Sequence, residues 1–263
     1  LTKQPGFKVD PGGGIHVRGG REHEVLVQVD GVSYRDPLVD STRQLSNFST
    51  LNVQEVEVLT GGDARYGGFQ AALINVSTPE GSMSDYAGTI EYRTDRVIPA
   101  KEKVDEHGVE YRENSFDSDQ YDYSFSGPMP FSDRLLGDKK LSFFTSGQAK
   151  LTNTYVPYNI RREANDYLGL GFSLPERQTN DYSTFWKLTY RMDEAKKVNL
   201  TYSRDYSLWD VYPEGGSGIS ANYGWRYKYN VENRPYSKMT RQTINLGFSH
   251  NISKTTLYEV SIG

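Results

Sequence analysis

Beyond residue 80 the sequence is dominated by long segments in which apolar and polar residues alternate strictly. In residues 241–252, Ile244 and Leu246 fall on one parity, whereas Asn245 and Gly247 fall on the other. Because successive side chains of a β-strand point to opposite faces, such a segment predicts a strand with one apolar and one polar face. Further segments repeat the pattern, and the predicted strands are residues 86–94, 120–127, 140–150, 182–192, 197–208, 241–252 and 255–262.

Two architectures use strands of this kind, the soluble β-sandwich and the membrane β-barrel. Strand length favours the barrel, because several segments reach about ten residues, the length that a tilted strand needs to cross a bilayer. The connections also alternate in length. Long stretches at 95–119, 151–181 and 209–240 alternate with a shorter link that carries Pro128 and Pro130 and with tight turns at 193–196 and 253–254. Long loops at one end and short turns at the other are typical of outer-membrane barrels.

A membrane protein built from helices is excluded, because no stretch approaches the roughly 20 apolar residues that a membrane-spanning helix needs. The first third of the chain is instead rich in glycine and in short apolar runs. The runs 25–29, 53–59 and 73–76 predict buried strands of a small mixed domain. Asp30-Gly31, which follows the first run, is a strong signal for a two-residue hairpin turn.

The change in pattern near residue 80 divides the chain into two predicted domains, residues 1–80 and residues 81–263. Leu1 is not a methionine and has no leader before it, and Gly263 interrupts an apolar alternation without a closing turn. We therefore expect a fragment, in which the first domain is incomplete at its N-terminal side and the second at its C-terminal side.

Four blocks of the first domain resemble the plug, or cork, domain of TonB-dependent outer-membrane receptors. They are Gln4-Pro5-Gly6-Phe7, the segment Ile15 to Gly20, the run from Val25 to Val32, and the long block from Val53 to Thr78. Each block alone is a weak signal, whereas four in the right order and spacing, followed by alternating strands, are a strong one. Beyond the plug, Tyr123 to Pro128 and Leu141 to Phe144 resemble the second and third barrel strands of the larger receptors of this family.

This resemblance implies a mixed α/β plug domain followed by the first seven antiparallel strands of a transmembrane β-barrel of about 22 strands. It implies location in the cell outer membrane, in contact with lipid. It also implies active uptake of a scarce solute, such as a metal chelate, a glycan or a peptide, with energy delivered by TonB. TonB would act through a segment that this chain lacks, and no cofactor is implied.

The resemblance also indicates where substrate binds, because ligands of this family bind at the outward apices of the plug and on the inner surfaces of the loops. The apex residues are Asp10, Gly12, Gly13, Arg21, Glu22, His23, Tyr34, Arg35 and Asp36. Aromatic residues of the third long loop, Trp209, Tyr212, Trp225 and Tyr227, are the second candidate group.

Each of these groups also has a purely structural interpretation. The glycine run is compatible with a flexible turn, and Arg21 to His23 with a solvated hairpin end. Tyr34 and Arg35 are equally compatible with a loop packed against the barrel wall, and the aromatic residues with loop-on-loop packing. Arg18 is predicted to lie on a buried plug strand. A buried charge needs a partner, so we expect Arg18 to pair with a barrel carboxylate as a structural lock between plug and barrel.

Other functional classes find little support in the sequence. The chain has no cysteine, its four histidines are scattered and no catalytic motif is present, so neither catalytic nor metal-binding residues are predicted. A net charge of -4 gives no electrostatic case for nucleic-acid binding. Two alternatives remain open. One is a receptor-like barrel that acts as a structural or assembly subunit with a lipoprotein partner, and the other is a secreted carbohydrate-binding β-sandwich.

Overall fold

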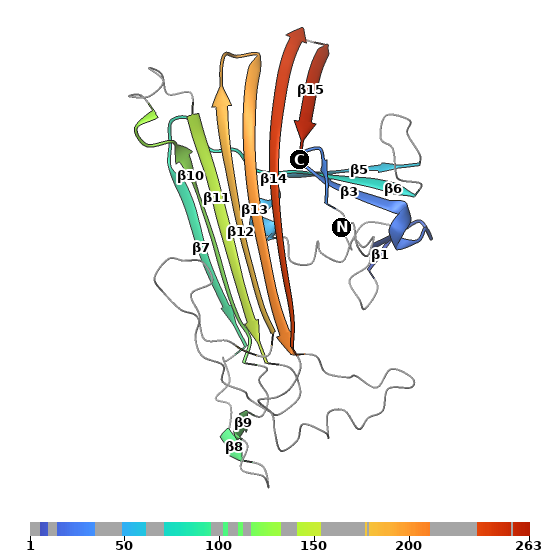
Figure 1. The fold of residues 1–263 in the computed structure, drawn as a ribbon, viewed down its shortest axis with the longest axis vertical. Coiled ribbons are helices and arrows are strands. Elements are labelled where there is room, and N and C mark those ends of the chain that lie inside the picture. The colour runs from blue at the N-terminus through green and yellow to red at the C-terminus, as the bar shows by residue number, and fades with distance from the viewer. Residues whose placement is uncertain are drawn as a thin grey trace.

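The protein is described by a computed structural model that consists mainly of two β-sheets (Figure 1). Two pairs of short strands lie outside these sheets: β1 (Phe7–Val9) pairs with β2 (Ile15–Val17), and β8 (Glu102–Val104) pairs with β9 (Glu110–Arg112). The residues that the structure describes are 6–9, 15–34, 49–61, 71–95, 102–104, 110–112, 117–132, 141–153, 177, 179–210, 236–253 and 255–263. Within these ranges, no helix has the length and apolar character needed to span a membrane.

The larger sheet contains each of the strands predicted beyond residue 80. They are β7 (Ala87–Thr94), β10 (Asp119–Pro128), β11 (Leu141–Thr152), β12 (Thr179–Arg191), β13 (Lys196–Asp210), β14 (Tyr236–Ser253) and β15 (Thr256–Ile262). The strand order is β15-β14-β13-β12-β11-β10-β7, and every neighbouring pair is antiparallel. This single up-and-down sheet, which we call the wall, has the topology of a barrel wall and not that of a two-layer sandwich.

The connections between wall strands are sorted by length, as predicted. Residues 95–118, 153–178 and 211–235 join strands at one end of the wall, which we call the loop end. Residues 192–195 and 254–255, together with the intermediate connection 129–140, join strands at the opposite end, which we call the turn end.

The two faces of the wall differ in chemistry. Exposed apolar and aromatic side chains lie on the face that points away from the smaller sheet, and they include Tyr86, Ile90, Tyr92, Tyr121, Phe125, Trp186, Leu200, Ile244, Leu246, Val260 and Ile262. The opposite face contributes polar side chains, among them Ser146, Lys187 and Asn245, that contact the turn and helix residues connecting the strands of the smaller sheet. An apolar outer face and a polar inner face are the arrangement that a wide membrane barrel requires.

The smaller sheet, which we call the plug sheet, has the order β4-β3-β6-β5. Its strands are β3 (Val25–Val29), β4 (Val32–Ser33), β5 (Glu55–Thr60) and β6 (Ala72–Ser77), with β3 parallel to β6 and the outer pairs antiparallel. Two short 3-10 helices, η1 (Glu22–Glu24) and η3 (Thr50–Asn52), precede β3 and β5. The core of the plug sheet is made by Ile15, Val17, Val25, Val27, Tyr34, Ala72, Ile74 and Val76.

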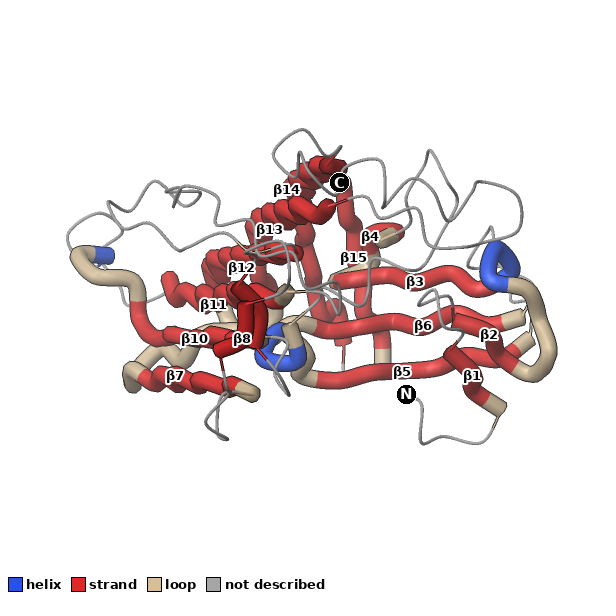
Figure 2. Tube along the Cα trace, turned by 90° about the horizontal axis from the view of Figure 1, so that it is seen from below, coloured by secondary structure: helices blue, strands red, loops and turns tan. Residues whose placement is uncertain are grey.

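The hairpin between β3 and β4 is formed as the sequence predicts. Asp30 and Gly31 occupy its turn with φ angles of 48° and 80°, the left-handed region that glycine and aspartate tolerate best. This turn brings the end of β3 to the inner face of the wall, where the Nδ2 of Asn245 donates to the carbonyl oxygen of Asp30 at 3.3 Å. The plug sheet therefore lies on the inner side of the wall, with its strands crossing the wall strands (Figures 1 and 2).

Candidate functional site

The centre of the interface between plug sheet and wall is a buried ion pair. Lys187, on the inner face of β12, lies 3.2 Å from the Oδ2 of Asp30, and its side chain is only 4% exposed. Its ammonium group also donates to the carbonyl oxygen of Thr78 at 3.2 Å and to the Thr78 hydroxyl at 3.0 Å. Thr78 in turn donates its backbone N–H to Asp30 at 3.0 Å. One wall cation therefore ties together the β3–β4 turn and the segment that follows β6.

A second contact joins Tyr34 to the wall. The Tyr34 hydroxyl donates to the Oδ2 of Asp205 on β13 at 2.7 Å, and the guanidinium of Arg241 lies 4.9 Å from the centre of the Tyr34 ring. Burial, followed by the charge of Asp205, raises the pKa of Tyr34 well above its ordinary value. The phenol is therefore a permanent hydrogen-bond donor at physiological pH.

A third contact involves Glu80, in the segment between β6 and β7. Its carboxylate lies 2.7 Å from the Nζ of Lys197 and 3.5 Å from a guanidinium nitrogen of Arg191, both on the inner face near the turn end. Burial alone would raise the pKa of Glu80, but the hydrogen bond from Lys197 and the charges of Lys197, Lys187 and Arg191 outweigh it, so the pKa is lowered. Glu80 is therefore ionised at neutral pH.

Two smaller features complete the interface. The Oγ of Ser146 on β11 bonds to the Oδ1 of Asn52, which is buried in η3. A small cavity of about 20 Å³ lies between plug sheet and wall, lined by Tyr34 and Asn245 among others. The Oδ1 of Asn245 has no partner among the described residues. A cavity of this size holds one water molecule, which can satisfy that oxygen.

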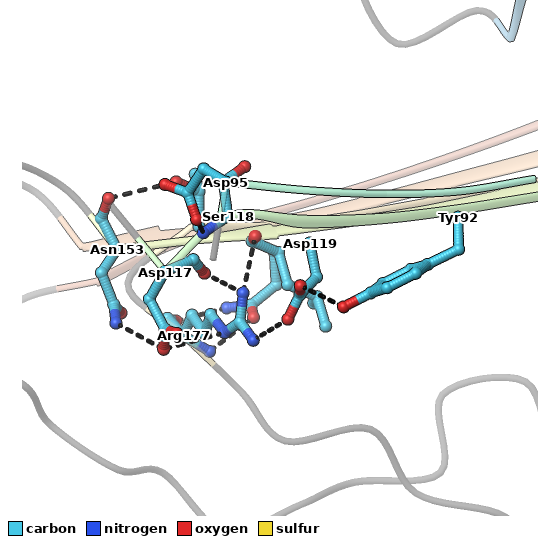
Figure 3. A network of polar contacts seen from close by, with 10 residues as sticks. Tyr92, Asp95, Asp117, Ser118, Asp119, Asn153 and Arg177 are labelled. Atoms are coloured by element: carbon cyan, nitrogen blue, oxygen red, sulfur yellow. Dashed lines mark hydrogen bonds and ion pairs between the residues drawn. The ribbon is translucent and has the colours of Figure 1, made fainter. Parts of the chain in front are cut away.

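A separate polar network lies at the loop end of the wall (Figure 3). Arg177, 6% exposed, forms ion pairs with Asp117 and Asp119 and donates to the carbonyl oxygen of Leu151 at 3.1 Å. Tyr92 of β7 donates to the other carboxylate oxygen of Asp119 at 2.8 Å. Arg177, two residues before β12, is therefore fixed to the start of β10 and the end of β11, where long connections end and begin.

The apex residues that the structure describes lie at opposite ends of β3. Arg21 and His23 are exposed beside and within η1, and Glu22 lies in the same turn. Tyr34 lies beyond the other end of β3 and is buried against the wall, which is the structural interpretation that the sequence left open. Asp10, Gly12, Gly13, Arg35 and Asp36 fall outside the described residues.

Of the predicted loop aromatics, Trp209 is half-buried in β13, and Tyr212, Trp225 and Tyr227 fall outside the described residues. The expectation for Arg18 is corrected by the structure. Strand β2 ends at Val17, and Arg18 occupies the following turn with an exposed side chain and a φ of 50°. No ion pair links it to any carboxylate of the described residues, and the buried ion pair between plug and wall is made instead by Lys187.

Sequence reasoning did not single out Lys187, Asp30 or Glu80 as a unit. Lys187 alone could have indicated an ion pair between plug and wall, because a lysine on the polar face of a predicted membrane strand needs a counter-charge. The identity of the plug carboxylate that provides this counter-charge depends on how the two sheets dock, and no local sequence pattern predicts the docking. Across the described part of the chain, no group of three or more His, Cys, Asp or Glu side chains could hold a metal ion.

Comparison with known proteins agrees with this architecture. The family of the TonB-dependent receptor plug domain matches residues 1–72. The ferric aerobactin receptor of Klebsiella pneumoniae is 30% identical over 184 residues, which cover 61% of this chain and 24% of that receptor. The chain thus spans about a quarter of the length of this curated relative.

Solved structures show the same fold. The siderophore receptor PirA from Pseudomonas aeruginosa superposes with a TM-score of 0.52 at 16% identity, over 98% of this chain and 34% of that one. The F5-1 variant of the FrpB iron transporter from Neisseria meningitidis gives a TM-score of 0.56 at 14% identity, over 99% of this chain and 36% of that one. These names are those of receptors and transporters and not of enzymes, as the sequence predicts.

Proposed function

Because this chain belongs to the TonB-dependent receptors of the outer membrane, we propose that it supplies the plug and the first part of the barrel wall of an importer for an iron chelate. The observation that carries the proposal is the docking of the plug hairpin on the polar face of a wall whose other face is apolar. A stopper held in this way closes a barrel that would otherwise be an open hole in the membrane.

The contacts between plug and wall suit a stopper that must move. They include ion pairs and hydrogen bonds made by single side chains, and the clustered apolar core of the plug sheet consists of plug residues alone. Apolar contact with the wall is added by Phe185, a buried residue of the inner face that lines the same small cavity as Val29 and Val32. Polar contacts of this kind can exchange with water when the plug shifts, whereas a shared apolar core would have to be opened to solvent. Energy from TonB would have to break these polar contacts.

An iron chelate is the substrate class that the relatives favour, over a glycan or a peptide. The curated relative is named for ferric aerobactin, and the two structural relatives are named a siderophore receptor and an iron transporter. Arg21 and His23 are exposed beside η1 and remain candidates for contact with the chelate. The apex and loop residues outside the described ranges complete the proposed binding surface.

Uptake of radioactive iron tests this function. The receptor that contains this chain is expressed in cells that lack their own ferric-chelate receptors, with and without TonB, and ⁵⁵Fe-loaded ferric aerobactin and other ferric chelates are supplied. We expect accumulation of at least one chelate only when both the receptor and TonB are present. No TonB-dependent accumulation of any chelate would overturn the proposal, and stable co-purification with a lipoprotein in that case would favour the role of an assembly subunit.

A further inference from the structure

The inner face of the wall carries three cations near its turn end, and each is paired with a carboxylate of the plug. We propose that Lys187, Arg191 and Lys197 form an anion-binding stripe that the plug covers at rest, and that negatively charged groups of a chelate engage this stripe as it passes the displaced plug. The proposal rests on the proposed function and deepens it, because it assigns a net negative charge to the transported chelate.

The three cations lie on the inner faces of two neighbouring wall strands. Lys187 and Arg191 are on β12, separated by the inward Thr189, and Lys197 of β13 is directly opposite Arg191. Four residues of a strand span about 13 Å, so the stripe follows the wall over that length. The cations become more exposed toward the turn end, where the side chains of Arg191 and Lys197 are 52% and 38% exposed.

The charges on these two strands are segregated along the barrel axis. The inward carboxylates of β12 and β13, Asp181 and Asp205, lie in the loop half of the wall. The inward charges in the turn half of the same strands are the three cations. Glu259 of β15 shares the row of Lys197 but lies two strands away.

The plug provides the counter-charges of the stripe. Asp30 lies 3.2 Å from Lys187, and Glu80 lies 2.7 Å from Lys197 and 3.5 Å from Arg191. Asp30 sits in the β3–β4 turn and Glu80 between β6 and β7, so both carboxylates are carried by plug segments. When those segments withdraw, the three cations lose their carboxylate partners and become available to another anion.

Space for a ligand group exists beside Arg191 and Lys197, at the part of the stripe nearest the turn end. A cavity of about 550 Å³ at the turn end is lined by Arg191, Lys197, Ser249 and Asn251 of the wall and by Met83 of the segment that follows Glu80. The turn residues Asp193 and Glu194 also line it, and Asp193 lies 3.5 Å from Lys196. Carboxylate groups of a ligand entering this cavity can take over the charge-assisted hydrogen bonds that Glu80 makes at rest.

Citrate, a compact tricarboxylate, is a suitable probe of the stripe. The full-length receptor in detergent is titrated with citrate by calorimetry at low salt, as wild type, as Glu80→Gln, and as Glu80→Gln combined with Arg191→Gln and Lys197→Gln. Glu80→Gln frees the two cations while changing few atoms, so we expect it to bind citrate about tenfold more tightly than wild type. The triple variant is expected to lose this gain.

Lys238→Gln in the Glu80→Gln background is the matched control, because Lys238 is an exposed lysine on the outer face of β14. It is expected to retain the tight citrate binding. The proposal is overturned if Glu80→Gln binds citrate no more tightly than wild type, or if the triple variant binds it as tightly as Glu80→Gln. This titration needs no transport, so its failure is distinct from an absence of TonB-dependent iron uptake.

Discussion

Asp30 is the residue at which the plug sheet, its hairpin and the wall meet. Its left-handed backbone turns the chain between β3 and β4, and its carboxylate accepts hydrogen bonds from Thr78 and Lys187. The Lys187 side chain is only 4% exposed, so the pair is more sensitive to loss of one partner than a surface ion pair is.

Lys187→Met should therefore loosen the plug. Removing one partner of a buried pair costs about 3–5 kcal/mol, and we expect the amide hydrogens of β3 and β6 to exchange correspondingly faster in the full-length receptor. Lys150→Met is the matched control, because Lys150 is an exposed lysine of the inner face of β11, and it should cost less than about 1 kcal/mol. Unchanged protection of β3 and β6 in Lys187→Met would show that the ion pair does not hold the plug.

Glu80 makes the attachment of residues 78–86 dependent on pH. Its pKa is lower in the folded state, so its contribution to stability is fully present above the ordinary glutamate pKa of about 4.3 and is lost as the pH falls through the lower, folded value. We expect amide protection of this segment to be constant between about pH 7 and 5 and to fall below about pH 4. Glu80→Gln should show reduced protection at pH 7 and a smaller fall in acid, whereas identical pH profiles would contradict this role.

The outer faces of the wall strands show where the membrane ends. Along β13 the outward residues are apolar from Val198 to Tyr202, and the next outward residue is Arg204, which is exposed and opposite Gln242 of β14. The strands continue beyond this polar pair to Asp210 and Tyr236. The wall therefore extends past the lipid on its loop side, as barrels with long outer loops do.

Two arginine substitutions on β14 test this boundary. Leu246→Arg places a charge in the apolar band and should destabilise the folded barrel by about 2–4 kcal/mol, whereas Gln242→Arg, four residues away on the same face, should cost at most about 1 kcal/mol. Folding free energies in lipid vesicles, measured by denaturant titration, give both values. Equal costs for the two variants would place the boundary elsewhere.

A glycine on one wall strand packs against an aromatic ring on the neighbouring strand. Gly147 of β11 is directly opposite Tyr123 of β10, and a Cβ at residue 147 would lie 2.3 Å from the tyrosine ring. The ring therefore occupies the space that a side chain would need, in the manner of aromatic rescue of glycine in sheets.

Gly147→Ala should consequently destabilise the barrel by about 1–3 kcal/mol, the usual cost of overpacking, and shift its heat-induced unfolding on gels to a lower temperature. Gly247→Ala of β14 is the control, because a Cβ there would make only ordinary contacts of 3.9 Å or more. Adding Tyr123→Ala should relieve the clash of Gly147→Ala. An equal shift for Gly147→Ala and Gly247→Ala would argue against the pairing.

At the scale of the whole molecule, strict alternation was enough to locate every wall strand, because a barrel strand at lipid depth must separate apolar from polar residues. It was less informative about strand ends. β14 begins at Tyr236 and not at 241, since the outward Lys238 and Thr240 lie beyond the apolar band and no longer mark the outer face. The domain boundary at residue 80 and the ligand roles of the apex residues stay predictions.

The docking of plug on wall could not be predicted in the same way. Asp30 and Lys187 are 157 residues apart, and no local pattern couples them. The lock was assigned to Arg18 because β2 was expected to extend beyond Val17. The turn at Arg18 and Gly19, with φ angles of 50° and 80°, takes the side chain out of the buried strand instead.

The position of the plug on the inner face of the wall is tested most directly by a disulfide between the two. A Cβ at Gly31 would lie 3.8 Å from the Cβ of Ser261 on β15, which is the mean spacing in disulfides. This chain contains no cysteine of its own that could compete. Gly31→Cys with Ser261→Cys should lose its reactive thiols on mild oxidation in outer membranes and regain them with reductant. Gly31→Cys with Val260→Cys, on the outer face one residue away, is the control and should keep both thiols. Free thiols are measured in both variants with a thiol-reactive label after oxidation, and equal labelling of the two variants would contradict the position of the plug.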